Sequence, residues 1–376
     1  MPRRLATLLA ALAVLPRLAL ALELPVVART LPNGLRVLVH EDHSAPVVSS
    51  YVFYHVGSRN EVRGATGISH LFEHMMFNGG KKFGRGVFDE LIEGNGGSTN
   101  GYTTRDYTAY LNNFPREALP IVLDLESDRN NATLVLAGDV DPQDAFRLVE
   151  RDFGAIPRRR PPLPVDATEP PQDGERRVVV RKNAELPAVM IGYHAPRALD
   201  ADRAPLDVVE RLLSGGESAR LHQDLVRRHE VATAVEANNT WGIDPDLFWI
   251  YAQARPKRTA AALEERIDAV VEGLQAKRVP DDELAKAKTQ LRAEYVEGLK
   301  TVSGKANKLG FFETVFGDYR ALFGLEDAWR AVTADDVQRV ARTYLVPTHR
   351  TVVVLEPVPA PGRPAASRAP RPGGVS

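Results

Sequence analysis

The alternation of apolar and polar residues divides the first part of the chain into strands and helices that follow no strict order. Stretches rich in β-branched and aromatic residues predict strands, and apolar residues at helical spacing predict helices. The predicted strands lie at 30–42, as two short runs around the turn pair Asn33-Gly34, and at 45–58, 98–115 and 132–140. The predicted helices lie at 67–80, 87–97, 116–129 and 141–157.

A second set of elements follows a stretch rich in proline and arginine at 157–175, which predicts a stiff linker. Strand patterns lie at 176–196, 231–240, 246–254 and 350–357. Helical patterns lie at about 204–228, in three further stretches, and after Thr333, which forms a capping pair with Asp336. The class is therefore α+β, with two related modules of mixed or antiparallel sheet packed with helices, at 24–156 and 176–357.

Composition adds limits on location and partners. The 376 residues are 44% hydrophobic and 26% charged with a net charge of -1, which gives no reason to expect a nucleic acid as partner. A basic start, an apolar run at 5–15 and the small residues Ala19 and Ala21, spaced as at a cleavage site, predict a signal peptide at 1–21 and a periplasmic or secreted protein without a stable membrane span. The alternative is an uncleaved N-terminal anchor. There is no cysteine, and a proline-rich tail at 358–376 reads as disordered.

The helix at 67–80 carries the candidate chemistry in the five letters "HLFEH". Residues i and i+4 share one helix face, so His70 and His74 can direct ring nitrogens at one metal ion. Glu73 lies on the same turn, where it can take a proton from an attacking water. The alternative is an amphipathic helix with two polar histidines and a solvated glutamate. The apolar residues around the histidines predict a half-buried site.

The flanks of this motif resemble the insulinase/pitrilysin family of zinc metallopeptidases, including bacterial proteins similar to processing peptidases. The resemblance rests on "GSRNE", "GISHLFEHMMFNGG", "NGGSTNGYTTRDYTAYLNNFP" and "NNATLVLAGDVDP" in the first half, and on "GYHAPRALDADRAPLDVVERLLSGGESARLHQDLV" in the second. It covers about 31–356. It implies Zn²⁺ held by His70 and His74, Glu73 as general base, and peptides or unfolded polypeptides as substrates.

The resemblance also implies a third zinc ligand, a glutamate on a later helix of the first module, and this chain lacks that segment. Here "LDLESDR" joins directly to "NNATLVLAGDV", so several dozen residues are absent and the first module is shortened. Counting the usual interval from His74 leads to Glu150, which belongs to a different part of the fold. Glu126 and Asp128 are stand-in candidates, and the other upstream histidines, His40, His43 and His55, are predicted in strands or loops.

Further residues matter through the resemblance alone. Asn100 matches an asparagine near the bound peptide, with a turn-forming Asn-Gly as the alternative, and Asp106 is either a second contact of a ligand histidine or a buried turn carboxylate. Members of the family carry an arginine–tyrosine pair in the second module where this chain has Val226 and Thr233; the neighbouring Arg227 and Arg228 are off that position. This suggests a homo- or heterodimer in which a second family subunit supplies the pair, with a plain scaffold role of the second module as the alternative.

Two functions from different classes remain. The first is a zinc-dependent metalloendopeptidase subunit. The second is a non-catalytic, metal-deficient binding or scaffold subunit of a processing-peptidase-like complex, and a truncated chain that does not fold stably is a third possibility. A carboxylate or histidine close to both His70 and His74 would favour the first.

Overall fold

The structure is a computed structural model that describes residues 24–79, 82–127, 132–158, 165 and 169–358. The predicted signal peptide, most of the predicted tail and Asp128 lie outside these residues. The first module contains β1 (Val27–Thr30), β2 (Arg36–Glu41), β3 (Val47–Tyr54), α1 (Ile68–Met76), α2 (Val87–Gly94), β4 (Ser98–Thr103), β5 (Thr108–Pro115), α3 (Leu119–Glu126), β6 (Thr133–Gly138) and α4 (Pro142–Phe153). Short 3₁₀ turns at Ser58–Asn60 and Arg116–Ala118 precede α1 and α3.

The second module begins after the linker. It contains β7 (Arg176–Lys182), β8 (Ala188–Ala195), α5 (Arg203–Ser214), a π-helical segment (His222–Arg228), β9 (Ala232–Asn239), β10 (Asp246–Ala254), α6 (Ala260–Ala276), α7 (Asp281–Gly298), α8 (Val302–Phe316), α9 (Leu325–Ala331), α10 (Ala334–Tyr344) and β11 (Arg350–Pro357). Two 3₁₀ turns, Tyr319–Gly324 and Pro347–His349, precede α9 and β11. The predicted capping pair of Thr333 and Asp336 is confirmed at the start of α10.

The two modules repeat one strand plan, which confirms the expected α+β class with two related modules. The described strands of the first sheet have the order β1-β2-β6-β3-β5-β4, and those of the second have the order β7-β11-β8-β10-β9. β2 pairs in parallel with β6, as β7 does with β11, and the remaining pairs of both series are antiparallel. Strands β2, β6, β3, β5 and β4 therefore correspond to β7, β11, β8, β10 and β9.

The two modules differ in the connection that leads into β6 of the first sheet and into β11 of the second. In the second module α6, α7, α8, α9 and α10 lie between β10 and β11. In the first module the corresponding connection, from Pro115 to Thr133, has a 3₁₀ turn and α3 as its described elements. The described part of this connection in the first module therefore lacks helices that the second module contains at the corresponding position.

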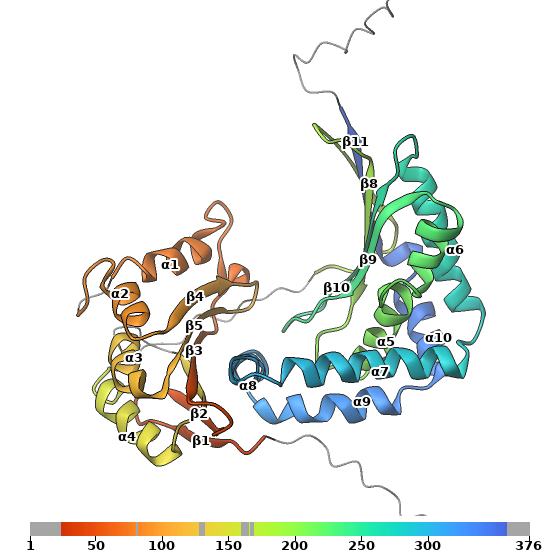
Figure 1. Cartoon of the computed structure of the whole chain (residues 1–376). Coiled ribbons are helices and arrows are strands. Elements are labelled where there is room, and N and C mark those ends of the chain that lie inside the picture. The colour runs from red at the N-terminus through yellow and green to blue at the C-terminus, as the bar shows by residue number, and fades with distance from the viewer. Residues whose placement is uncertain (1–23, 80–81, 128–131, 159–164, 166–168, 359–376) are drawn as a thin grey trace, which may run out of the picture.

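Helix α8 of the second module packs on the first sheet. Figure 1 shows it beside β3, where it covers the face opposite to α3 and α4. Tyr51 and Phe53 of β3 and Val135 of β6 are buried in the core that α8 shares with the second module. Polar contacts across the same junction join Arg36 to Glu313, with Nε and Oε1 2.6 Å apart, and Lys305 to Asp42.

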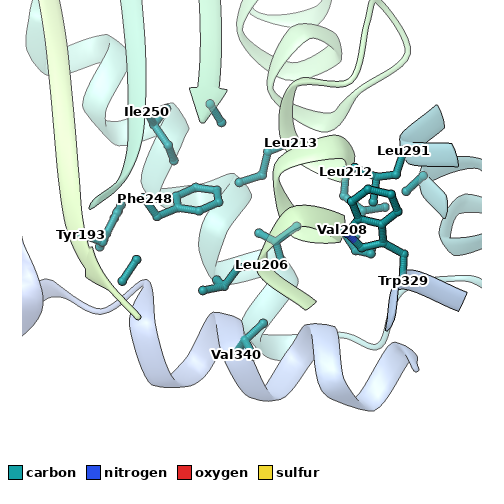
Figure 2. Close-up of a cluster of buried hydrophobic side chains, with 14 of the residues drawn as sticks. Tyr193, Leu206, Val208, Leu212, Leu213, Phe248, Ile250, Leu291, Trp329 and Val340 are labelled. Atoms are coloured by element: carbon teal, nitrogen blue, oxygen red, sulfur yellow. The ribbon is translucent and has the colours of Figure 1, made fainter. Parts of the chain in front are cut away.

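The core of the second module surrounds α5 (Figure 2). Leu206 and Leu213 face Phe248 and Ile250 of the sheet, and Leu291 and Trp329 lie beside Leu212. The carboxylate of Asp207 is buried there and accepts a hydrogen bond from Trp329 Nε1 at 2.9 Å. Burial raises the pKa of Asp207, although Arg203 beside it opposes the shift.

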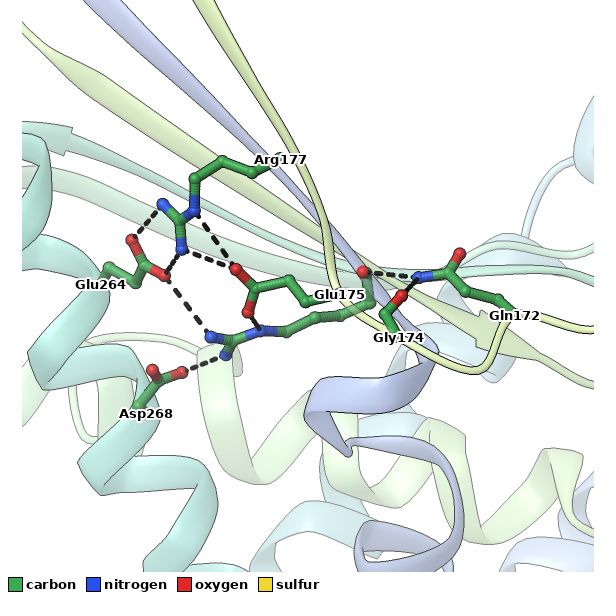
Figure 3. Close-up of polar contacts among 7 residues, drawn as sticks. Gln172, Gly174, Glu175, Arg177, Glu264 and Asp268 are labelled. Atoms are coloured by element: carbon green, nitrogen blue, oxygen red, sulfur yellow. Dashed lines mark hydrogen bonds and ion pairs between the residues drawn. The ribbon is translucent and has the colours of Figure 1, made fainter.

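An ionic network fixes the start of the second module (Figure 3). The guanidinium of Arg350 in β11 is buried and binds Glu175 at 2.7 Å and Asp268 of α6 at 2.6 Å. Arg177 of β7 pairs with Glu175 and with Glu264. The network connects the end of the linker to the helix face of the second sheet.

Within the described residues, no helix combines the length and the apolar composition that a membrane crossing requires.

Replacement of Gly310 in α8 by alanine is expected to lower the free energy of unfolding by about 1–3 kcal/mol. A Cβ at this position would lie 2.0 Å from Cε2 of Phe53, whose ring is buried and cannot move without disturbing the core. Urea unfolding followed by circular dichroism measures the effect.

Gly273→Ala is the matched control, since Gly273 lies in α6 and a Cβ there meets no atom within 4 Å. It is expected to raise stability by up to about 1 kcal/mol through helix propensity. Equal effects of the two substitutions would contradict the close packing of α8 on the first sheet.

Candidate metal centre

The loop before α1 holds the start of this helix. The Glu61 carboxylate accepts hydrogen bonds from the backbone N–H groups of Gly67 and Ser69, each at 2.8 Å, and these bonds lower the pKa of Glu61. Ser69 Oγ donates to the carbonyl of Gly57 at 3.1 Å, and a Cβ on Gly57 would overlap the backbone of Arg105. The "GSRNE" sequence is therefore the element that caps and positions α1.

The two histidines of α1 converge. His70 Nε2 and His74 Nε2 are 3.1 Å apart, and the ring planes are inclined at 38°. Two nitrogens that each lie about 2.0–2.1 Å from a tetrahedral zinc ion are about 3.3 Å apart. The observed separation, within hydrogen-bond distance, is also close to the one that a shared metal ion requires, and both side chains are exposed.

Glu73 lies on the buried side of the same turn. Glu73 is 5% exposed, and its Oε2 accepts a hydrogen bond of 2.6 Å from Thr103 Oγ1 on β4. Thr103 is in turn 3.2 Å from the hydroxyl of Thr108, which donates to the carbonyl of Val56. Neighbouring strands thus fix Glu73 while the histidines remain open to solvent.

None of the described stand-in ligands joins the histidines. No group of three or more histidine, aspartate or glutamate side chains suited to a metal occurs among the described residues. Glu126 is fully buried and accepts from Asn112 Nδ2 at 2.8 Å, and Glu150 is exposed on α4. His40 lies in β2, and His43 and His55 lie in loops, as predicted.

The apolar residues around the histidines are exposed, so the prediction of a half-buried site is wrong. Leu71, Phe72 and Met75 of α1 are 57%, 55% and 51% exposed, and Ile68 is exposed beside them. This apolar face has no cover within the described structure because the connection between α3 and β6 is short. An amphipathic pattern in the sequence predicts that one face of a helix is apolar. It does not indicate whether another segment packs against that face.

Comparison with known proteins places this geometry in a family. Residues 36–151 match the profile of "Insulinase (Peptidase family M16)", and residues 128–291 match that of "Peptidase M16 inactive domain". The chain belongs to the insulinase family. It is similar to zinc protease PqqE of Helicobacter pylori, with 27% identity covering 87% of this chain and 92% of the relative. An uncharacterized zinc protease of Streptomyces coelicolor is 25% identical, over 84% of this chain and 86% of its own length.

The fold agrees with this assignment. The crystal structure of a protease from Helicobacter pylori superimposes with a TM-score of 0.85 at 25% identity, covering 89% of this chain and all of that chain. The alignment with the PqqE relative runs over 410 residues, more than the 87% of 376 residues that this chain contributes to it. Several dozen positions of that insulinase-family relative therefore have no counterpart here.

The second module indicates which element the first one lacks. α5 follows β8 and precedes β9, as α1 follows β3 and precedes β4. α7 packs along α5, and Glu294 of α7 pairs with Arg211 of α5. A counterpart of α7 would lie on the exposed face of α1 and would bring side chains to its histidines.

The other predicted site residues are placed as follows. Asn100 lies in β4 at the edge of the described first sheet, so the alternative of a turn-forming Asn-Gly is wrong. Asp106 lies in the β4–β5 turn, where it contacts Arg59 and accepts from the backbone of Ile243; burial raises its pKa. It therefore occupies the buried turn position that was the alternative to a contact with a ligand histidine.

The region that would supply the arginine–tyrosine pair is also ordered. Val226 and Arg228 lie in the π-helical segment, and Thr233 lies in β9. Arg227 pairs with Glu217 and Arg228 with Asp224. Both arginines are thus engaged locally.

Thr103 is a site residue that sequence reasoning missed. Its sequence context, "STNGYTT", signals a strand but not a contact 30 residues away with Glu73. The strand pairing that brings β4 to α1 is a tertiary property.

Thr103→Val is expected to lower the free energy of unfolding by about 1–3 kcal/mol, because it removes a hydroxyl that donates to a buried carboxylate. Chemical unfolding measures this. A double-mutant cycle with Glu73→Gln should show coupling between the two residues.

Thr99→Val is the matched control in the same strand. The Thr99 hydroxyl is buried and has no hydrogen-bond partner among the described residues, so its loss should be neutral or stabilising. A similar loss of stability in both variants would remove the support for the Thr103–Glu73 contact.

Proposed function

We propose that this chain is a zinc-dependent metalloendopeptidase subunit that hydrolyses bonds in peptides or unfolded polypeptides. The observation that supports it most is the 3.1 Å separation of His70 Nε2 and His74 Nε2 on α1, one residue from a fixed carboxylate. The names of the similar proteins, zinc proteases, point to the same metal and reaction.

Each residue of the proposed site has a separate role. His70 and His74 would hold Zn²⁺, which would supply a Lewis acid that polarises the scissile carbonyl and lowers the pKa of water. Glu73 takes the proton of the attacking water on its carboxylate and passes it to the leaving amine. Thr103 holds that carboxylate in place, and the edge of β4 around Asn100 pairs with an extended substrate by strand addition.

Location and partners are part of the proposal. The N-terminal 21 residues suit export to the periplasm or beyond. The absence of the arginine–tyrosine pair at Val226 and Thr233 supports a dimer with a second family subunit that supplies it.

A second function is a non-catalytic binding or scaffold subunit. The observation that favours it is the lack of a third metal-binding side chain near the histidines in the described residues. Two protein ligands leave more positions to water and bind zinc more weakly than three.

Zinc titration of the mature chain by calorimetry is expected to reveal one saturable site, because the two imidazoles are already convergent. His70→Ala should abolish it, since one histidine cannot chelate. His43→Ala is the control: this histidine is bound to Glu41 and Asp139 in a loop and should leave the zinc isotherm unchanged. Zinc binding that survives His70→Ala would contradict the site.

Glu73→Gln separates catalysis from metal binding. It is expected to leave the zinc isotherm unchanged and to lower the turnover of an unfolded polypeptide, in the presence of the partner subunit, by about 10²-fold or more. Gel-based degradation and calorimetry on the same sample measure the two effects. Equal turnover of variant and wild type would support the scaffold function.

A further inference from the structure

The second sheet has one face that its own helices do not cover. On β8 and β10 the buried residues Ile191, Tyr193, Phe248 and Ile250 face the helices, and the alternating residues point the other way. The outer face, as we call it, comprises Val178 and Val180 of β7, Val353 and Leu355 of β11, Met190 of β8, and Leu247, Trp249 and Tyr251 of β10.

The strand register makes the outer face continuous. Val178 pairs with Val353, Val353 with Met190, and Met190 with Tyr251, so one apolar row crosses four strands. Val178, Met190 and Leu247 are 49%, 40% and 41% exposed. Apolar patches of this kind mark interaction sites on soluble proteins.

The first sheet shows what covers such a row in this fold. On the corresponding strands Leu38 pairs with Val135 and Val135 with Tyr51, and all three are buried beneath α8. The helix that precedes α8 in the chain, α7, covers α5. One consecutive helix pair therefore covers both α5 and the face of the opposite sheet (Figure 1).

Because the two modules repeat one plan, each covered surface has a counterpart in the other module. The exposed face of α1 corresponds to the covered face of α5, and the outer face corresponds to the face of the first sheet that α8 covers. Both are apolar, and no segment that the structure describes covers either of them. One missing helix pair explains why both surfaces are exposed, because a single pair equivalent to α7 and α8 would cover both.

Within the described residues, no helix pair covers these two surfaces. Residues 127–132 between α3 and β6 span at most about 20 Å and are too few for two helices.

We propose that the exposed face of α1 and the outer face together form a docking site for two consecutive amphipathic helices of another polypeptide. The first helix lies on Leu71, Phe72 and Met75, and the second lies across Met190 and Val353. By analogy with Glu294 on α7, the first helix carries a carboxylate toward His70 and His74, and this last part rests on the proposed function.

The test uses as probe the segment of the Helicobacter pylori PqqE relative that lies between its counterparts of α3 and β6, as a fluorescently labelled peptide. Binding to the mature chain is measured by anisotropy in EDTA, so that docking is scored without metal, and helix formation is measured by circular dichroism. A scrambled peptide of the same composition is the negative probe.

The expected result is saturable binding with a gain of helix. Leu71→Asp and Met190→Asp, on the two surfaces, should each weaken it by about tenfold or more, as loss of a buried apolar contact predicts. Val27→Asp is the control, since Val27 is exposed on β1 at the opposite edge of the first sheet. No binding, or binding that both aspartate variants leave unchanged, would overturn the proposal.

Zinc affinity, measured with and without the probe, separates this inference from the proposed function. The probe should strengthen zinc binding, and a probe with its glutamates replaced by glutamine should dock without that gain. Docking without any zinc binding contradicts the proposed function and leaves the docking site intact. Zinc held tightly by the chain alone, with no docking of the probe, overturns the docking site and leaves the proposed function intact.

Discussion

The packing of α8 on the first sheet is the contact on which the rest of the structure depends. The first module encloses a hydrophobic core with α3 and α4 on one face of its sheet, but the other face is buried by a helix that belongs to the second module. Gly310 allows the backbone of α8 to approach the ring of Phe53, and the ion pairs of Arg36 and Lys305 fix its direction. The two modules are consequently one folding unit.

The same arrangement explains why α1 is firmly positioned on one side and exposed on the other. Glu61 caps α1, Ser69 ties it to Gly57, and Glu73 is anchored to β4 through Thr103. These contacts all lie on the side toward the sheet. The opposite side depends on helices that the second module has and the first lacks, so the histidine pair is positioned without being enclosed.

Much of this was predictable from the sequence, for identifiable reasons. Turn chemistry at Asn33-Gly34 and the capping pair of Thr333 and Asp336 are local, and the α+β class follows from residue periodicity. The convergence of His70 and His74 follows from helix geometry alone. The burial of Glu73 and the exposure of Leu71 do not follow, because both depend on which distant segment lies against α1. Residue patterns identify apolar faces, and only tertiary structure shows which faces are paired.

The cross-module position of α8 has a consequence for the order of events during synthesis. The first sheet is complete at Gly138 and α8 begins at Val302, so at about 5–20 residues per second the ribosome needs roughly 10–30 seconds to deliver α8 after the first sheet has emerged. During this interval Tyr51, Phe53 and Val135 have no cover, so the N-terminal half stays incompletely folded until its last helix arrives. Because the first core is completed only when α8 arrives, the order of elements along the chain itself delays folding of the first module.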